Sequence, residues 1–432
     1  MKTSKYNYIF NTDEGNFVFN TISDSFVGIS DKICQRLKSE KVNSIKGEAL
    51  DILLKRNIIV PDDMDEYQFL INEYEKNLES DIYDLTLLPT LDCNVRCWYC
   101  FEKQQKGSRL HKIVREAILA HVKRVLLEKP YINRFFITLF GGEPLLYFEE
   151  DVYPLMKEMQ IAIESENRTV SFLCVTNGIC LTEKNIQLMK GMDINFQVSI
   201  DGYKRKHDSI KKIKEHSDIS SYDQVMKNIS LVVAELSAHI NLRINYDDNT
   251  LHHLTEVLES IKGIPRERIT VHFERVWQTI ERCPSNNEEL KTVFNTFIQS
   301  GFSITYLNLF RRSHSCRASR INQIAVSYDG SVYKCTGRDF TSNLKEGVLR
   351  TDGTVKWLPE KIKKRLSIKT YDHMLCRICK LLPLCWGACC QKQLEASSES
   401  EIAAKCQMNI MELPLNDYLF FRMKSRQKHI NE

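Results

Sequence analysis

Three cysteines close together on the chain are the residues best suited to chemistry. Cys93, Cys97 and Cys100 lie in the segment LDCNVRCWYC, which has C-x3-C-x2-C spacing. Three thiols with this spacing on a loop suit an iron–sulfur cluster better than structural zinc, which takes four closed ligands. A four-iron cluster held by only three cysteines leaves one iron open to a small chelating ligand. The spacing therefore indicates a reactive cluster rather than a structural one.

A second group of cysteines lies in the C-terminal third of the chain. The sequence has 15 cysteines in all, and in a reducing compartment such a number indicates metal or redox chemistry rather than disulfides. Four scattered cysteines (Cys34, Cys174, Cys180 and Cys283) are predicted to be small buried hydrophobic residues. The second group consists of Cys316, Cys335, Cys376, Cys379, Cys385, Cys389, Cys390 and Cys406.

The composition excludes several classes of protein. Lys and Arg number 60 against 56 Asp and Glu, a formal balance of +4, which argues against a nucleic-acid or membrane-surface partner held by bulk charge. No apolar run approaches the roughly 18–20 residues of a membrane span. The first residues, MKTSKYNYIFNTDEGN, lack an apolar signal core, so we expect a cytoplasmic protein. At 432 residues and 43% apolar, the chain is long enough for two or three globular domains.

The elements that must position these residues follow a strand–helix alternation that begins near residue 84. Six such repeats imply a parallel α/β sheet, either open or barrel-like. Apolar strands are predicted at 84–91, 135–140, 170–175, 194–200, 239–246 and 269–273. Amphipathic helices are predicted near 111–128, 150–165, 182–191, 222–238, 250–262 and 288–300.

Polar and glycine-rich motifs follow the first four predicted strands. Ligands bind at the carboxyl ends of strands in such sheets, so these motifs should meet at one edge. Cys93 follows the first strand, and the later motifs are Gly141-Gly142-Glu143-Pro144, Thr176-Asn177-Gly178 and Asp201-Gly202. The sequence therefore predicts a single site on one face of the sheet.

Two further regions flank this central part. Residues 1–82 contain a predicted hairpin, 6–10 with 17–20, followed by helical segments, and their order resembles a winged-helix module. Residues 301–432 form a predicted cysteine-rich domain with a hairpin at 324–327 and 331–334. A final helix is predicted at 411–428. Residues 83–300 would then be the central domain.

The motifs LDCNVRCWYC, LFGGEP, VTNG and QVSIDG together resemble the radical S-adenosylmethionine (SAM) enzymes over roughly residues 84–280. The resemblance implies a partial (β/α)6 barrel. It also implies that a [4Fe–4S] cluster on Cys93, Cys97 and Cys100 chelates the amino and carboxylate groups of SAM. One electron would then cleave SAM to methionine and a 5′-deoxyadenosyl radical, which abstracts a substrate hydrogen.

The same resemblance implies which residues bind SAM. Many relatives have an arginine for the SAM carboxylate where this chain has Lys211, and a lysine supplies the charge without the bidentate fork. For the residues on the third and fourth strands, ordinary turn chemistry is the alternative role. The methionine amino group would meet Gly141, Gly142 and Glu143, the adenine would lie beside Tyr99, and the pocket would be lined by Thr176, Asn177, Ser199 and Asp201.

The C-terminal cysteines resemble the SPASM extension of radical SAM enzymes, which carries two auxiliary iron–sulfur clusters. The resemblance implies an outer cluster on Cys376, Cys379, Cys385 and Cys406, and an inner one on Cys316, Cys335 and Cys389. Seven cysteines leave one place of eight unfilled. Either the inner cluster has an open iron, or Cys283, Cys390, His314 or a substrate thiol occupies the place. A structural zinc module is the alternative for this region.

SPASM enzymes mainly modify peptides or proteins, so the resemblance implies a peptide maturase that forms a thioether or another crosslink. Its partners would be a precursor peptide, whose leader adds a strand to a sheet edge in residues 1–82, and a reductant such as flavodoxin or ferredoxin. The alternatives are an anaerobic sulfatase-maturating enzyme and a small-molecule SPASM enzyme. Sulfatase maturases usually have an aspartate directly after the cysteine that Cys335 matches. Here Thr336 follows, and Asp339 is the next candidate for a catalytic base.

Overall fold

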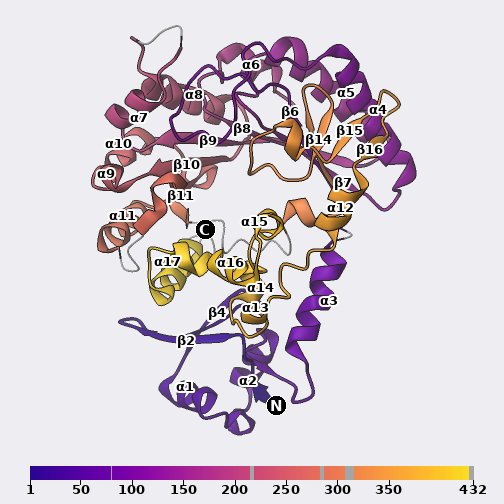
Figure 1. Cartoon of the computed structure of the whole chain (residues 1–432). Helices are drawn as coiled ribbons and strands as arrows, with labels where there is room; N and C mark the ends of the chain where they lie inside the picture. Colours follow the sequence, from indigo (N-terminus) through magenta and orange to yellow (C-terminus); the bar gives the residue numbers. More distant parts are fainter. Residues whose placement is uncertain (79, 215–217, 283–286, 307–315, 428–432) are drawn as a thin grey trace. The chain divides into compact units, whose positions relative to one another are not determined.

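The computed structural model describes the whole chain except residues 79, 215–217, 283–286, 307–315 and 428–432 (Figure 1). The chain divides into two compact units. The first comprises Met1–Glu79, Asn308–Arg320 and Arg365–Met423, and the second comprises Ser80–Leu307, Ile321–Lys364 and Lys424–Glu432. The predicted domain 301–432 is therefore divided between the units, because its strands join the large sheet whereas its cysteine-rich helices pack on the N-terminal residues.

A parallel sheet forms the centre of the second unit. All six predicted strands are present, and neighbours along the chain pair in parallel register. This confirms the predicted α/β class with its (β/α)6 arrangement (Figure 1). The strands are β6 (Ile82–Leu88), β7 (Arg134–Leu139), β8 (Thr169–Thr176), β9 (Ile194–Asp201), β10 (Ile240–Tyr246) and β11 (Ile269–Arg275).

The sheet continues beyond these six strands on both sides. Strand β12 (Ser303–Tyr306) pairs with β11, and β13 (Gln323–Ser327) pairs with β6, both in parallel. The predicted hairpin is present as β13 and β14 (Ser331–Tyr333), followed by the short antiparallel strands β15 (Gly347–Leu349) and β16 (Val355–Trp357). Segments from both ends of the second unit thus extend one continuous sheet.

Alternation along the strands separates an apolar face from a polar one. In β9, residues Ile194, Phe196, Val198 and Ile200 are buried, whereas the side chains between them are polar and half-buried. Successive side chains of a strand point to opposite faces, so the apolar set faces the helices and the polar set lines the inside of the sheet. The main helices of this unit are α4 (Lys112–Glu128), α5 (Tyr153–Glu164), α6 (Glu183–Leu188), α7 (Lys204–Ile210), α8 (Ser221–Glu235), α9 (Asp248–Leu251), α10 (Val257–Ile261) and α11 (Glu288–Gln299).

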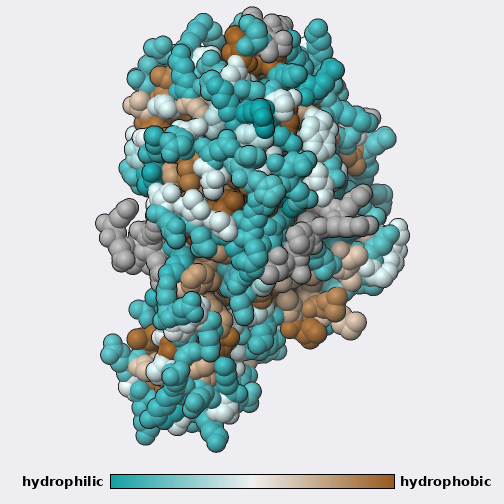
Figure 2. Space-filling view, turned by 90° about the vertical axis from the view of Figure 1, so that its left-hand side faces the viewer, coloured by the Kyte–Doolittle hydropathy of each residue, from teal (hydrophilic) through white to brown (hydrophobic). Residues whose placement is uncertain are grey.

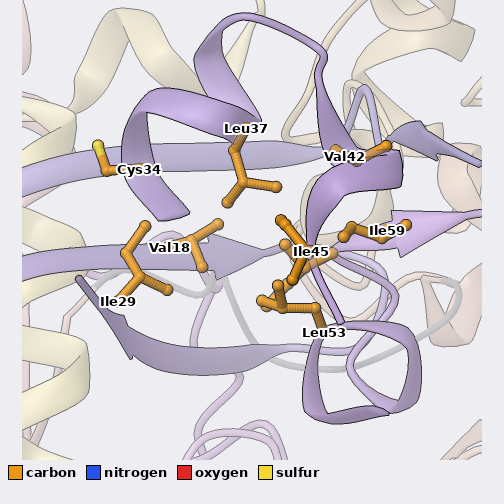
Figure 3. Close-up of a cluster of buried hydrophobic side chains, with 9 residues drawn as sticks. Val18, Ile29, Cys34, Leu37, Val42, Ile45, Leu53 and Ile59 are labelled. Carbon is orange, nitrogen blue, oxygen red and sulfur yellow. The ribbon is translucent and has the colours of Figure 1, made fainter. Parts of the chain in front are cut away.

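The first unit contains a small antiparallel sheet of β2 (Asn7–Thr12), β3 (Gly15–Asn20) and β4 (Ser25–Ile29). The first two strands are the predicted hairpin. Helices α1 (Asp31–Lys38) and α2 (Glu48–Lys55) follow, as in the predicted winged-helix-like order. Figure 3 shows their apolar side chains gathered against β3, with Val18 and Leu37 in the core. Cys34 is 5% exposed in this cluster, which confirms its prediction as a buried hydrophobic residue.

The cysteine-rich helices share a second apolar cluster with the N-terminal residues of the first unit. Tyr6 and Tyr74, the latter on α3 (Glu66–Leu78), pack with Leu382 and Trp386. A buried ion pair adds to this contact, since Arg422 Nη2 lies 2.9 and 2.8 Å from the two carboxylate oxygens of Asp24. The cluster takes residues from α13 (Met374–Arg377) and α14 (Leu382–Cys385), and the ion pair takes Arg422 from α17 (Leu415–Gln427). Helices α15 (Cys390–Glu395) and α16 (Glu399–Ala404) lie between them along the chain.

The described helices include none that is long and apolar enough to cross a membrane. On the face drawn in Figure 2, hydrophobic residues form separate patches among hydrophilic ones.

Candidate functional site

The three spaced cysteines lie on the loop between β6 and α4, and hydrogen bonds close the base of that loop. The Asp92 carboxylate accepts from the backbone N–H groups of Cys93 (2.8 Å) and Gly107 (2.7 Å). Thr90 Oγ1 donates to the Ser108 carbonyl at 2.7 Å. These hydrogen bonds fix the chain both before and after the three cysteines.

The glycine turn after β7 packs directly on this loop. Gly142 N–H donates to Thr90 O (3.1 Å), and Glu143 N–H donates to Asp92 O (2.8 Å). A Cβ at Gly142 would lie 2.1 Å from Asp92 O, and one at Gly141 would lie 2.5 Å from Thr90 O. Only glycine allows this approach of two backbones, so the glycines hold the turn and the cysteine loop together.

The chemistry of the loop thiols suits metal ligands. Cys93 is 6% exposed, and burial raises its pKa to about 12, with further contributions from Glu143, Cys97 and Cys100. Burial also raises the pKa of Cys97 to about 11. Thiols this close to one another hold their protons at neutral pH unless a metal replaces them. The set therefore has the character of cluster ligands.

The Glu143 carboxylate joins the second and third predicted motifs. It is fully buried and accepts hydrogen bonds from Thr176 Oγ1 (2.8 Å), Asn177 N–H (2.9 Å) and Leu145 N–H (3.2 Å). Burial nevertheless raises the pKa of Glu143. The motif residues Glu143, Thr176 and Asn177 thus meet at the carboxyl ends of β7 and β8.

Two asparagine side chains contact Cys93, the most buried of the three loop cysteines. Asn177 Nδ2 donates to Cys93 Sγ at 3.7 Å and to Asn94 Oδ1 at 2.7 Å. Asn94 Nδ2 in turn donates to Cys180 Sγ at 3.4 Å. Cys180 is half-buried in this polar network, so its prediction as a plain buried hydrophobic residue was wrong. Cys174, by contrast, is fully buried as predicted.

Tyr99 connects the cysteine loop to β9 and β10. Its hydroxyl donates to Asp201 Oδ1, and Asn245 Nδ2 donates to both groups at 3.1 Å. Burial, followed by the Asp201 charge, raises the pKa of Tyr99 well above its usual value, so the phenol stays protonated. Asp201 Oδ2 is buried and has no hydrogen-bond partner among the described residues.

Lys211 is buried beside the same aspartate. Its ammonium donates to the Ser199 carbonyl and to Ser199 Oγ (3.1 Å), and it lies 3.6 Å from Asp201 Oδ2. The preceding His207 accepts a hydrogen bond from Asp201 N–H at 3.2 Å. Burial, followed by the Lys211 charge, lowers the pKa of His207 to about 3, so this imidazole is neutral.

All the predicted SAM-side residues therefore meet at the carboxyl ends of β6 to β9. Asn94 and Asn245 were missed. Asn245 could have been found, because Asn241, Arg243 and Asn245 alternate with apolar residues along β10 and must share the polar inner face. Asn94 carried no such signal, since a loop has no periodicity that orients a side chain.

Four cysteines of the first unit line one pocket. Burial and the neighbouring thiols raise the pKa of Cys376 to about 11 and of Cys385 to about 12. The remaining lining is mostly apolar, which would shield a cluster from water. The four cysteines are the predicted outer set, Cys376, Cys379, Cys385 and Cys406.

The predicted inner set is divided between the two units. Hydrogen bonding from the Cys316 thiol lowers the pKa of Cys389 to about 5, so these two sulfurs are neighbours in the first unit. Cys335 belongs to the second unit. Among the candidates for the missing ligand, Cys390 is fully buried beside Arg365 (3.8 Å from its Nη1), whereas Cys283 and His314 lie outside the described residues.

Within the described ranges, no three His, Cys, Asp or Glu side chains are arranged around a single metal ion.

Asp339, the predicted candidate base, lies beside the cysteine loop. Its carboxylate is 3.8 Å from the ammonium of Lys103, which follows Cys100 by three positions. The next residue, Phe340, packs with Leu88 and Leu91 at the end of β6. This apolar contact holds the segment after Cys335 at the carboxyl edge of the sheet.

Comparison with known proteins identifies the class. Residues 87–261 match the sequence profile of the radical SAM superfamily. A cysteine-type anaerobic sulfatase-maturating enzyme of Clostridium novyi is 23% identical over 334 residues, covering 69% of this chain and 85% of that protein. A GTP 3′,8-cyclase of Clostridium perfringens is 29% identical over 303 residues, covering 65% of this chain and 88% of that protein.

The region that matches the radical SAM superfamily folds as a parallel α/β sheet and has three thiols at its carboxyl edge. The chain is therefore a radical SAM enzyme. Its fold is similar to that of anSMEcpe. The structure of native anSMEcpe with bound AdoMet has a TM-score of 0.56 and 20% identity, and covers 81% of this chain and 98% of that one. The complex of anSMEcpe with AdoMet and the Cp18Cys peptide is equally similar, with a TM-score of 0.56 and 21% identity.

Proposed function

We propose that this radical SAM enzyme modifies a ribosomally synthesised precursor peptide by forming a thioether or another crosslink. The observation that carries the proposal is the presence of two sets of grouped thiols, one at the carboxyl edge of the large sheet and one in the first unit. The second set packs, through Leu382, against the N-terminal residues. Thiols for auxiliary clusters and a small sheet suited to peptide binding therefore share one unit.

Three residues would hold the reactive cluster, namely Cys93, Cys97 and Cys100. When bound, this cluster and SAM would supply a 5′-deoxyadenosyl radical that takes a hydrogen atom from the substrate. Glu143 would accept the methionine ammonium, and the Gly141-Gly142 backbone would fix its position. Tyr99 and Asp201 would hold the cysteine loop against β9, beside the adenosyl group.

Thioether formation removes two hydrogens from the peptide. The C–H hydrogen leaves as an atom to the adenosyl carbon, and the S–H hydrogen leaves as a proton with one electron. The proposed auxiliary clusters, on the four-thiol pocket and on Cys316, Cys335 and Cys389, would accept this electron. We assign the proton to Asp339, which lies at the edge of the cysteine loop.

Formylglycine formation is the second candidate function. It is favoured by the similarity to a sulfatase-maturating enzyme and by the position of Asp339 beside Lys103. The two reactions give different products from a cysteine-containing peptide. A crosslink removes two hydrogens and keeps the sulfur, whereas formylglycine formation removes the sulfur.

The test is anaerobic reconstitution of the full chain, followed by reduction with SAM and a cysteine-containing precursor peptide. We expect about 12 iron per chain, counting four for each of three clusters, and 5′-deoxyadenosine release. Mass spectrometry should show a peptide that has lost two hydrogens and kept its sulfur. Loss of sulfur would support formylglycine formation instead, and the absence of 5′-deoxyadenosine would contradict both functions.

Strand β4 is the edge at which we propose that the leader binds. The sheet order β2-β3-β4 leaves two edges, and Lys380 contacts the edge at β2, where its ammonium donates to the Asn7 carbonyl at 3.2 Å. No described strand pairs with the outer side of β4, and its Gly28 is exposed. An extended peptide gains backbone hydrogen bonds at such an edge.

Hydrogen–deuterium exchange would locate the leader. With the leader added, we expect amide exchange to slow in residues 25–29 and to stay unchanged in residues 7–12, because we place the leader at β4 and Lys380 already contacts the β2 edge. A leader of scrambled sequence is the control and should slow neither strand. Protection of β2 alone, or of neither strand by the true leader, would contradict leader binding at β4.

A further inference from the structure

A basic residue on the inner face of the sheet is not accounted for by the predicted site. Arg243 is the central residue of β10, and its register partners are Ser199 on β9 and His272 on β11. Arg243 shares its face with Asn245, two residues further along the strand. Asn245 contacts both Tyr99 and Asp201, so Arg243 lies one strand position below this network.

One hydrogen bond orients the Arg243 guanidinium. Its Nε donates to Asn245 Oδ1 at 3.1 Å. The two terminal nitrogens, Nη1 and Nη2, have no hydrogen-bond partner among the described residues, and the side chain is half-buried. This is a planar pair of charged donors, which matches the two oxygens of a carboxylate.

The neighbouring charges on this face are already paired. The nearby His272 bonds to Glu274 Oε2 at 2.9 Å. On the other side, Lys211 lies 3.6 Å from Asp201 and donates to the Ser199 carbonyl and hydroxyl. Lys211 stands where relatives have an arginine, and its ammonium is bonded to groups of the protein itself. The two terminal nitrogens of Arg243, by contrast, have no partner among the described residues.

We propose that Arg243 binds the carboxylate of the methionine part of SAM, and that Lys211 serves as the internal counter-charge of Asp201. The proposal rests on the proposed function, since it requires SAM at this edge of the sheet. Arg243 faces Ser199 across the β9–β10 pair, and Ser199 lies at the predicted SAM pocket. Two charged hydrogen bonds from Arg243 on β10 would then replace the bidentate contact that relatives make with an arginine at the position of Lys211.

The test compares SAM with decarboxylated SAM, which lacks only the carboxylate. Binding of each is measured by equilibrium dialysis to the anaerobically reconstituted full chain. We expect the wild type to prefer SAM, since both the cluster and Arg243 would use the carboxylate, and we expect Arg243 to contribute about tenfold to a hundredfold of this preference, the range of charged hydrogen bonds. Arg243→Gln should weaken SAM binding by that factor, leave decarboxylated SAM unchanged and so reduce the preference by the same factor.

Three further variants make the comparison specific. Arg243→Lys should keep part of the preference, because it keeps the charge but not the fork. Lys211→Met should retain the preference even where it weakens both ligands. Arg134→Gln is the matched control, since Arg134 is exposed at the start of β7 and pairs with Asp81 at 2.9 Å; its preference should equal that of the wild type.

The outcomes separate this inference from the proposed function. A preference that is undiminished in Arg243→Gln, or that falls by the same factor in Lys211→Met, would overturn the role of Arg243 while leaving SAM binding in place. Failure of the wild type to bind SAM at all would overturn both. The ratio of two affinities is taken within each variant, so partial loss of folded protein does not change its meaning.

Discussion

Replacing Cys93, Cys97 and Cys100 together by alanine is expected to abolish 5′-deoxyadenosine release and to leave most of the iron in place. The three thiols lie on one loop of the second unit, whereas the four-thiol pocket lies wholly in the first. Loss of the loop ligands should therefore remove one cluster, and total iron should fall from about 12 to about 8 per chain.

The substitutions remove only small side chains, so we expect the loop to keep its shape. Its base is held by Asp92 and Thr90, which bond to backbone groups rather than to the thiols. Iron analysis, inorganic sulfide analysis and chromatographic measurement of 5′-deoxyadenosine follow the two effects separately. The loss of this cluster and the loss of 5′-deoxyadenosine release should both be complete, because all SAM cleavage takes place at the open iron of this cluster.

Two matched variants complete the test. Cys34→Ala removes a buried thiol from the small N-terminal core and should change neither iron nor SAM cleavage. Cys385→Ala removes a ligand from the four-thiol pocket and should lower the iron content while SAM cleavage continues. Persistent 5′-deoxyadenosine release in the triple variant would refute the assignment of these cysteines.

The parts of the site that lie next to a strand end could be predicted from the sequence. Cys93 and Glu143 follow apolar runs whose type and length were clear, and parallel strands bring such positions to one edge. The four-thiol pocket was also foreseen as a set, because the spacing of Cys376, Cys379 and Cys385 resembles a known pattern. Local signals and family spacing were enough in both cases.

What could not be predicted depends on register and on distant packing. The pairing of β13 with β6 joins residues more than 200 positions apart, and no local pattern specifies it. The same holds for Asn94 and for the partners of Lys211, since a buried lysine bonds to whichever acceptors the fold brings near. From its position in the motif, Lys211 was expected to bind the SAM carboxylate. It is instead bonded to Ser199 and lies beside Asp201, so this is the expected role that the structure changes most.

Gly142→Ala is expected to disrupt the reactive site with a single added methyl group. That methyl would lie 2.1 Å from Asp92 O and 2.6 Å from Asp92 C, both backbone atoms that cannot rotate away. Asp92 O also accepts the Glu143 N–H at 2.8 Å, so relief of the clash must break this bond and separate the turn from the cysteine loop. Overpacking of this kind costs about 3 kcal/mol.

Gly263→Ala provides the matched control, because a Cβ there meets no atom within 4 Å and the backbone of neither glycine needs a left-handed conformation. We expect Gly142→Ala to lose about four iron per chain and its 5′-deoxyadenosine release, with a lower thermal transition of the second unit. Gly263→Ala should keep all three properties. Since the two substitutions add the same methyl group and differ only in what it meets, equal SAM cleavage by both variants would mean that the contact between the glycine turn and the cysteine loop is not needed to form the site.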